Sequence, residues 1–261
     1  MNSKLIYVLV LLGALGFSLI KNGLSLNRSE EWIVNILGIA LLIIIFAPYT
    51  IQSIRFQKKY GLILPILQVD KDPGRFIKEL EKLLKSLKDK KTRNYYKISL
   101  AAGYCENGEY EKAHEVLLSV NPKNISTIMK AVYYNNLYAI LFNMGEIEKA
   151  IKVIDSNQTL FQQNEHHPML GAAYAINMVY RFLAEKQLEK AKFYYEKAAK
   201  LGDIPHLKDT IDYLKAEILF NEADYEGSWH IVNKLQKVKL VPSIKEKVIE
   251  LEYKLSKAFN K

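Results

Sequence analysis

The apolar residues of this chain follow two patterns. Near the start lie two runs without a charged residue, residues 5–20 and residues 32–51. From residue 73 onward, apolar residues recur every three or four positions among polar and charged ones, which is the spacing of amphipathic helices. The sequence therefore predicts an all-α protein whose N-terminal part differs in kind from the remainder.

The two uncharged runs have lengths that suit membrane helices. At about 1.5 Å per residue, residues 32–51 would span roughly 30 Å, the thickness of one bilayer core. Residues 5–20 would span about 24 Å, which is sufficient if Lys4 and Lys21 extend their side chains toward water. We expect residues 1–60 to form a two-helix transmembrane hairpin with a basic juxtamembrane segment.

The first run has an alternative interpretation as a cleaved signal peptide. Lys4 is the only charge before it, no clear Ala-x-Ala motif follows it, and the second run begins only eleven residues later. Trp32 and Tyr49 also stand where the aromatic residues of a membrane helix meet the headgroups. These features favour two uncleaved helices.

Basic residues are concentrated after the second run. The chain has a net charge of +9, and residues 52–97 carry thirteen basic and five acidic side chains. The positive-inside rule therefore places both termini in the cytoplasm and the connector 21–31 outside a cell membrane. Arg55, Lys58 and Lys59 would then face anionic lipid headgroups.

A nucleic-acid partner is not expected. Such a partner requires a basic surface with interleaved aromatic residues, whereas residues 98–261 carry 21 basic and 21 acidic side chains. Attraction to membrane lipids accounts for the basic segment instead.

A ten-residue phrase occurs four times, and each copy combines the end of one helix, a tight turn and the start of the next helix. The copies stand at residues 104–113, 141–150, 182–191 and 219–228. Their closing small residues are spaced by 37, 41 and 37 positions: Ala113, Ala150, Ala191 and Ser228. One helix pair cannot bury its apolar stripe alone, so this period predicts stacked helix pairs.

These repeats resemble the tetratricopeptide repeat (TPR). Gly108 and Gly145 match the turn glycine of that family, which ends a helix in the left-handed conformation, whereas Lys186 replaces it in the third copy. The resemblance implies an α-solenoid of about four TPR-like helix pairs within residues 92–261. A composition rich in Lys and Asn favours a bacterial membrane-anchored member.

A capping helix is expected before the repeats, within a linker and cap of residues 61–91. Asp72 and Pro73 would begin this helix, as an N-cap and a first-turn proline. The apolar segment 61–69 before it would lie either at the membrane or beneath the first repeat. The residues leave both options open.

A second capping helix is expected at the C-terminus, over residues 244–259. Ser243 would cap it, and its lysines would provide a polar outer face: Lys245, Lys247, Lys254 and Lys257. The wider second spacing, of 41 residues, would come from a long polar loop at residues 155–168.

In TPR proteins the first helix of each pair lines a concave groove, and the resemblance implies which residues line it here. The predicted groove residues are Tyr95, Ile98, Asn135, Phe142, Ile176, Tyr180, Leu183, Tyr213, Glu217 and Phe220. This apolar and aromatic surface would suit an extended or helical peptide, or the chain's own last helix. Ile98 and Ile176 do not suit the carboxylate clamp that some members of the family carry.

Catalytic and metal-binding motifs are not found in the sequence. It lacks a phosphate-binding glycine loop, Gly-x-Ser-x-Gly and His-Glu-x-x-His. Glu165, His166 and His167 lie together without a clear further ligand, so neither a metal nor another cofactor is expected. Cys105 is the only cysteine, which excludes an internal disulfide and suits a reducing compartment. We expect no enzyme activity.

The leading hypothesis is a membrane-anchored, cytoplasm-facing TPR scaffold that recruits protein partners through its concave groove. Two alternatives stay open. One is a peptide-responsive regulator, and the other is a structural subunit of a membrane complex that contacts its partners through the hairpin.

Overall fold

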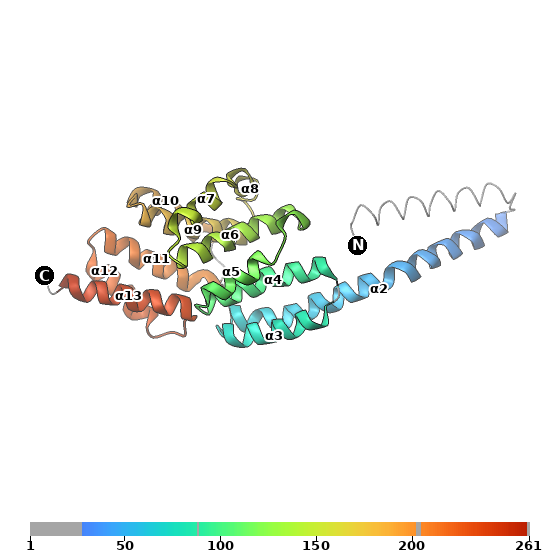
Figure 1. The fold of residues 1–261 in the computed structure, drawn as a ribbon, viewed down its shortest axis with the longest axis horizontal. Coiled ribbons are helices and arrows are strands. Elements are labelled where there is room, and N and C mark those ends of the chain that lie inside the picture. Colours follow the sequence, from blue (N-terminus) through green and yellow to red (C-terminus); the bar gives the residue numbers. More distant parts are fainter. Residues whose placement is uncertain (1–27, 88, 202–204, 260–261) are drawn as a thin grey trace. The chain divides into compact units, whose positions relative to one another are not determined.

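A computed structural model describes residues 28–87, 89–201 and 205–259, and some side chains of the first helix also lie outside the description. Every regular element in these ranges is a helix, which confirms the all-α prediction (Figure 1). The elements are α2 (Arg28–Gln68), α3 (Pro73–Ser86), α4 (Lys90–Glu106), α5 (Tyr110–Leu118), η1 (Pro122–Asn124), α6 (Thr127–Asn143), α7 (Ile147–Asp155), α8 (Gln158–Gln162), α9 (Pro168–Ala184), α10 (Leu188–Leu201), η2 (Pro205–Leu207), α11 (Lys208–Asn221), α12 (Tyr225–Leu235) and α13 (Pro242–Phe259). The chain divides into two compact units, residues 1–59 and residues 60–261.

In the first unit, the structure describes the N-terminal part of α2. This helix covers the second uncharged run, and eight of its apolar side chains are exposed: Ile33, Ile36, Ile39, Leu42, Ile43, Ile44, Ile51 and Ile54. Among the residues described, no helix combines the length and the hydropathy that a membrane crossing needs. The first run, residues 5–20, and half of the side chains of residues 32–51 lie outside the described part of the chain.

The second unit begins with the last turns of α2, which include the apolar segment 61–69. Ile63 and Ile66 are buried, and the Tyr60 ring lies 5.0 Å from that of Tyr96 between centroids. The Tyr60 hydroxyl also donates to the hydroxyl oxygen of Ser99 at 3.0 Å. Of the two options that the sequence left open, the structure therefore shows this segment packed against the first repeat.

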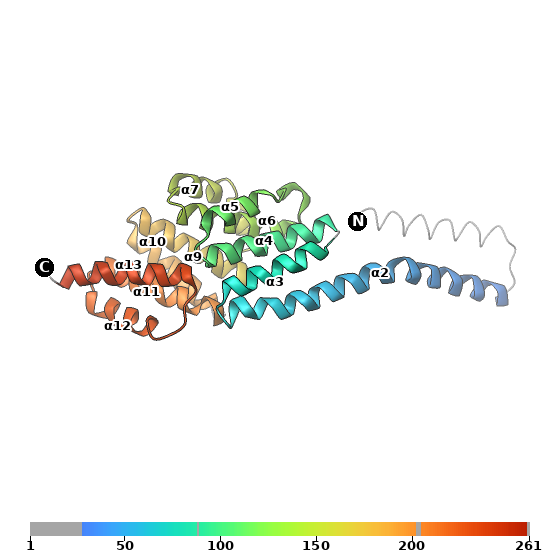
Figure 2. The same cartoon turned by 60° about the horizontal axis from the view of Figure 1, so that its bottom comes forward.

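Helix α3 follows and packs along α4 (Figures 1 and 2). The Asp72 side chain accepts a hydrogen bond from the backbone N–H of Arg75 at 2.9 Å, which confirms the predicted N-cap. Phe76 and Leu80 are fully buried on the α4 side of α3. A Cβ on Gly103 would stand only 2.7 Å from Phe76 Cδ1, so a glycine there lets the two helices approach closely.

Four helix pairs make up the body of the second unit. They are α4 with α5, α6 with α7, α9 with α10 and α11 with α12, and the first helices of successive pairs also contact one another. The small residues that close the repeats are all completely buried, which lets the two helices of a pair come close: Ala113, Ala150, Ala191 and Ser228. This packing of consecutive helices is compatible with an α-solenoid.

The four turns within the pairs share one backbone conformation. Gly108 and Gly145 both have φ +78°, which confirms the prediction for these glycines, and Lys186 (φ +57°) and Ala223 (φ +62°) take the same left-handed conformation. In each turn the following N–H donates to the carbonyl five residues earlier, at 2.8 to 2.9 Å. This is the Schellman arrangement, which satisfies carbonyls left free at a helix end.

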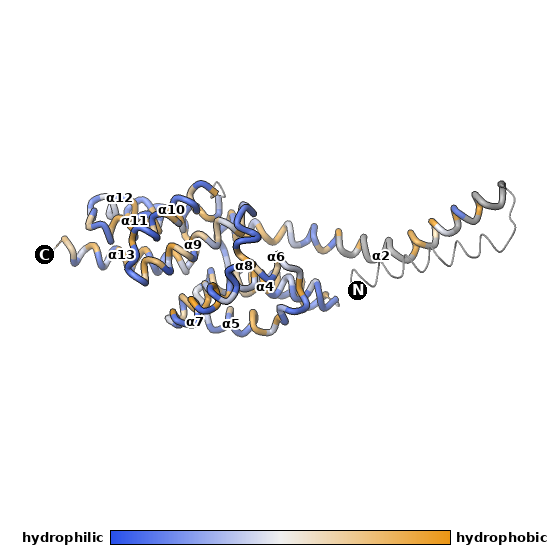
Figure 3. Tube along the Cα trace, turned by 90° about the horizontal axis from the view of Figure 1, so that it is seen from above, coloured by the Kyte–Doolittle hydropathy of each residue, from blue (hydrophilic) through white to orange (hydrophobic). Residues whose placement is uncertain are grey.

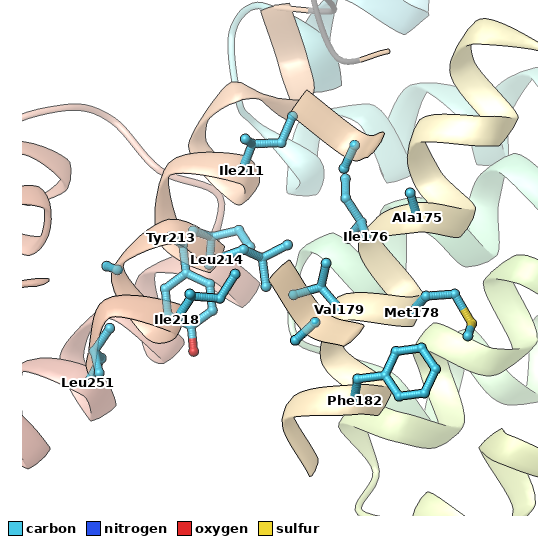
Figure 4. Packing of buried hydrophobic residues seen from close by; sticks show 14 of the residues in the cluster. Ala175, Ile176, Met178, Val179, Phe182, Ile211, Tyr213, Leu214, Ile218 and Leu251 are labelled. Atoms are coloured by element: carbon cyan, nitrogen blue, oxygen red, sulfur yellow. The ribbon is translucent and has the colours of Figure 1, made fainter. Parts of the chain in front are cut away.

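The described hydrophobic core includes two clusters, one that joins the second, third and fourth pairs to α13 and one between the first and second pairs. Along the helices of the second unit, apolar residues alternate with polar ones (Figure 3). Figure 4 shows the side chains of α9 and α11 meeting, with Ile176 and Val179 on one helix and Ile211 and Leu214 on the other. Burial of such side chains contributes about 1.5–3 kcal/mol each relative to exposure.

Two local predictions were wrong. Residues 155–168 are not only a polar loop, because they include α8, whose Phe161 is buried and stacks on Tyr174 with ring centroids 4.8 Å apart. Ser243 does not cap the last helix. That helix begins one residue earlier, at Pro242, and its first N–H groups bond the carbonyl of Val241.

Candidate functional site

The candidate site is a cavity of about 180 Å³ between the first helices of the pairs and the start of α13. We call it the central cavity. It is lined by Ala102, Cys105, Glu106, Asn135, Asn136, Ala139, Asn143, Ala173, Ile176, Asn177, Tyr180, Leu207, Thr210, Ser243, Ile244 and Lys247. Half of these side chains are polar or charged, whereas the predicted groove residues are mainly apolar and aromatic.

A pair of asparagines joins the second and third helix pairs across the cavity. The Asn177 amide donates to Oδ1 of Asn135 at 2.9 Å and to the backbone carbonyl of Asn135 at 3.1 Å. Both side chains are buried. Because buried amides are costly when unpaired, this double contact fixes α6 and α9 in one register.

Two residues of α13 reach into the cavity. The Ser243 hydroxyl donates to Oε2 of Glu106 on α4 at 2.9 Å. The Lys247 ammonium donates to Oδ1 of Asn143 at 2.6 Å and lies 4.7 Å from the centre of the Tyr180 ring. The last helix therefore contacts the first, second and third pairs through its first two turns.

The titratable groups of the cavity are strongly affected by burial. Burial raises the pKa of the Glu106 carboxyl, an effect that the Ser243 hydrogen bond and the charge of Lys247 oppose. Burial also raises the pKa of the Cys105 thiol to about 12 and lowers the pKa of Lys247. The Tyr180 phenol has a pKa well above its usual range for the same reason. At neutral pH the Cys105 thiol is therefore protonated and a poor nucleophile.

Three of the ten predicted groove residues line the cavity, namely Asn135, Ile176 and Tyr180. Phe142 and Tyr213 stand on either side of Tyr180, with ring centroids 5.6 Å and 6.5 Å from its own. These three rings form a row across α6, α9 and α11. The structure thus brings half of the predicted groove residues together.

The two predicted groove residues of the first pair lie elsewhere. Tyr95 is 41% exposed and packs beside Tyr60 of α2, with ring centroids 5.9 Å apart. Ile98 is 1% exposed in a core that also contains Tyr133 and Ile140 of α6. The close approach of α6 to α4 moves the cavity one to two turns further along α4, to Cys105 and its neighbours.

The predicted residues of the fourth pair do not line the cavity either. Tyr213 is buried and donates to Glu217 at 2.7 Å, and Lys254 of α13 lies 3.9 Å from the same carboxylate. Phe220 packs against Tyr225, with ring centroids 5.5 Å apart. Helix α13 packs on α11 and α12 at this place. Leu183, on the third pair, is half-buried against the core.

Lys247 was expected on the polar outer face of the last helix, and this prediction was wrong. The residue lies on the same side of α13 as the buried Ser243 and Leu251, so it faces the cavity. Lys245 and Lys257 are exposed, as expected. Spacing within the helix places Lys247 with the buried residues, which is the signal that sequence reasoning missed.

The remaining candidates lie on exposed surfaces or in local structure. Arg55, Lys58 and Lys59 are exposed on α2. The His167 ring accepts a hydrogen bond from the Leu170 N–H at 3.3 Å and so caps α9, while the His166 side chain is 97% exposed. The described residues contain no group of three or more His, Cys, Asp or Glu placed to hold a metal ion.

No family model matches this sequence, and comparisons with curated proteins and with solved structures also found no match.

Proposed function

We propose that this protein is a membrane-anchored helical-repeat scaffold of the TPR type, which faces the cytoplasm and recruits protein partners through the central cavity. The observation that carries the binding role is that Asn136, Asn177 and Tyr180 line the same central cavity. These residues come from two successive helix pairs. Amide and ring groups that line a cavity suit a polypeptide, whose backbone offers a donor and an acceptor at nearly every residue.

The membrane anchor is supported by the exposed apolar residues of α2. Successive residues of an α-helix point about 100° apart around its axis. Leu42, Ile43 and Ile44 are consecutive and all exposed, so apolar side chains face outward in several directions around this part of α2. A helix that is apolar all round belongs in a protein core or in a bilayer. Together with the uncharged run of residues 5–20, these residues favour a hairpin in the membrane, with the basic residues after it at the lipid surface.

A second candidate, a regulator that responds to a small peptide, is favoured by the size of the cavity. A space of about 180 Å³ is smaller than a typical ligand pocket of about 300–1,000 Å³. A few residues of a peptide would fill it. Binding of a short peptide with a change in compactness of the protein would favour this alternative over the scaffold.

Photo-crosslinking in cells tests the scaffold. A crosslinking amino acid at Asn136, in the cavity, should capture defined partner proteins from the source cell. The same amino acid at Phe193, a side chain of α10 that is 62% exposed and does not line the cavity, serves as the control. Capture only from Phe193, or equal capture from both positions, would contradict the proposal.

A further inference from the structure

The first two turns of α13 form one side of the central cavity. Ser243, Ile244 and Lys247 supply all of the contacts that α13 makes with the cavity lining. Lys247 is the only basic residue among the described residues of that lining. Without α13, the Glu106 carboxylate and the Tyr180 ring would face the cavity with no cation beside them.

The contacts of Lys247 are those that a lysine from another chain would make. Its ammonium lies over the Tyr180 ring at 4.7 Å and donates to Asn143 at 2.6 Å, and Glu106 lies within electrostatic range. An ammonium over an aromatic face contributes about 0.5–2 kcal/mol. Ser243 adds a hydroxyl that donates a hydrogen bond to the Glu106 carboxylate.

Apolar side chains along the whole of α13 are buried in the main core, because Ile244 and Val248 in the first two turns belong to the same cluster as the later turns. Leu251 and Leu255 are completely buried in the core cluster that also includes Val232 and Leu235 of α12. The segment before the helix, residues 236–239, is exposed. A helix that replaces the first two turns must therefore also cover the apolar surface that Ile244 and Val248 bury, while Leu251 and Leu255 keep the later turns attached.

We propose that the first two turns of α13 are an internal ligand of the central cavity, and that the partner is a helical segment presenting a lysine to Tyr180, Asn143 and Glu106 in place of Lys247. This inference rests on the proposed binding function. A helical occupant follows because α13, the occupant seen here, is itself a helix whose Ser243, Ile244 and Lys247 share one face at i, i+1 and i+4 spacing. Helix α13 and the helix of the partner therefore compete for the central cavity.

The rate at which the single cysteine, Cys105, is labelled shows whether the first two turns of α13 occupy the cavity, so no further cysteine has to be introduced. Cys105 lines the cavity and is half-buried there. In the full-length protein in detergent, maleimide should react slowly with Cys105 in the wild type. Lys247→Glu, which places a carboxylate beside Glu106, should speed that reaction about tenfold or more. The control Lys245→Glu makes the same charge change on the exposed face of α13 and should leave the rate unchanged.

A synthetic peptide of residues 240–259 then tests the partner chemistry. Added to the Lys247→Glu protein, it should slow Cys105 labelling again, and the same peptide carrying Lys247→Glu should not. Ser243→Asp, which opposes Glu106 from the other end, provides a second opened variant if Lys247→Glu does not fold. Equal labelling of wild type and both opened variants, or no protection by the lysine peptide, would overturn the inference.

Two further outcomes are decisive. Protection that rises with the concentration of the protein itself, without peptide, would assign the occupant to α13 of a second copy and would overturn the proposal of a different partner. Partner capture from Asn136 with unchanged Cys105 labelling would leave the scaffold function standing and remove only this inference. Changed labelling without any capture would remove the scaffold function and, with it, the partner helix of this inference.

Discussion

The Lys247 ammonium lies 4.7 Å from the centre of the Tyr180 ring, which joins the last helix to the third helix pair. The same ammonium bonds Asn143 of the second pair, and Ser243 one turn earlier bonds Glu106 of the first pair. Helix α13 is therefore more than a cover for the end of the array. It connects helices separated by more than a hundred residues in the sequence.

Reversing the charge of Lys247 should weaken the fold. In Lys247→Glu, a carboxylate would replace the cation beside Glu106 and Tyr180, and the expected loss is about 2 kcal/mol or more in the free energy of unfolding. Lys245→Glu, on the exposed face of α13, should change it by less than about 0.5 kcal/mol. Urea unfolding of the full-length protein in detergent checks both, and equal effects would contradict the position of Lys247.

The two turns without glycine should gain stability from one. Lys186 and Ala223 have positive φ values, which cost a residue with a Cβ roughly 1–2 kcal/mol, partly offset by the greater chain entropy of glycine. Lys186→Gly and Ala223→Gly should each raise the free energy of unfolding by about 0.5–1 kcal/mol. Lys186→Ala keeps the Cβ and should give no such gain. A gain from Lys186→Ala as large as that from Lys186→Gly would assign the effect to the side chain instead of the backbone.

The converse holds at Gly145, which has φ +78° and open space around the position of a Cβ. Gly145→Ala should therefore cost about 1 kcal/mol through the backbone alone. A loss much larger than this in the same unfolding experiment would indicate a steric conflict that the structure does not contain.

The Asn135–Asn177 pair should behave as one unit. Each single change to alanine leaves a buried amide or carbonyl without its partner, so each should cost about 1–3 kcal/mol. The double variant should cost less than the sum, with a coupling of about 0.5–3 kcal/mol in a double-mutant cycle. Asn221→Ala, which removes an exposed amide that bonds the Glu217 carbonyl, is the control and should cost little. Strict additivity would show that the two amides do not stabilise each other.

Glu106 should make the protein less stable as pH rises. Because burial raises the pKa of this carboxyl above 4.5, the folded state holds the proton more tightly than the unfolded state does. Its contribution to the free energy of unfolding therefore falls as pH rises from about 4.5 through the folded pKa. The charge of Lys247 and the Ser243 hydroxyl oppose this effect without cancelling it.

Glu106→Gln keeps an acceptor for Ser243 and removes the ionisation. The free energy of unfolding of Glu106→Gln minus that of the wild type, measured by urea unfolding, should therefore increase from pH 4 to pH 8. Glu246→Gln, on the exposed side of α13, is the control and should follow the wild type. A Glu106→Gln curve parallel to the wild type would contradict the burial of this carboxyl.

The hairpin proposal predicts the sidedness of single cysteines placed in a Cys105→Ser protein. An impermeant maleimide should label Ser25→Cys, in the connector, in intact cells. It should label Lys237→Cys, in the exposed segment before α13, only after the membrane is opened. Labelling of Lys237→Cys in intact cells would reverse the proposed orientation, and recovery of the chain free of membranes would remove the anchor.

The helix pairs and their turns could be predicted from the sequence because they depend on local signals. Gly108 and Gly145 end their helices, the small closing residues recur every 37 to 41 positions, and the helices form where the repeats place them. Lys186 also takes the left-handed conformation without being glycine, because the surrounding Schellman hydrogen bonds hold the turn. The repeat thus determined the backbone even where one residue departed from it.

The groove was predicted less well because its surface depends on which helices cover it. Tyr95 packs beside Tyr60 at the end of α2, Ile98 is covered by α6, and Tyr213 is covered where α13 packs on α11. None of these contacts has a signal in the repeat itself. The position of Lys247 on the buried side of α13 could have been derived from its spacing to Leu251, but not its contact with Tyr180.

If the central cavity is the surface that binds the partner, a side chain that fills it should abolish binding. Thr210 lines the cavity, so Thr210→Trp should block it, whereas Thr159→Trp on exposed α8 should not. With the crosslinker at Asn136, Thr210→Trp should abolish the capture that the wild type and Thr159→Trp both show, with an unchanged far-ultraviolet circular dichroism spectrum. Undiminished capture by a folded Thr210→Trp protein would contradict binding at the cavity.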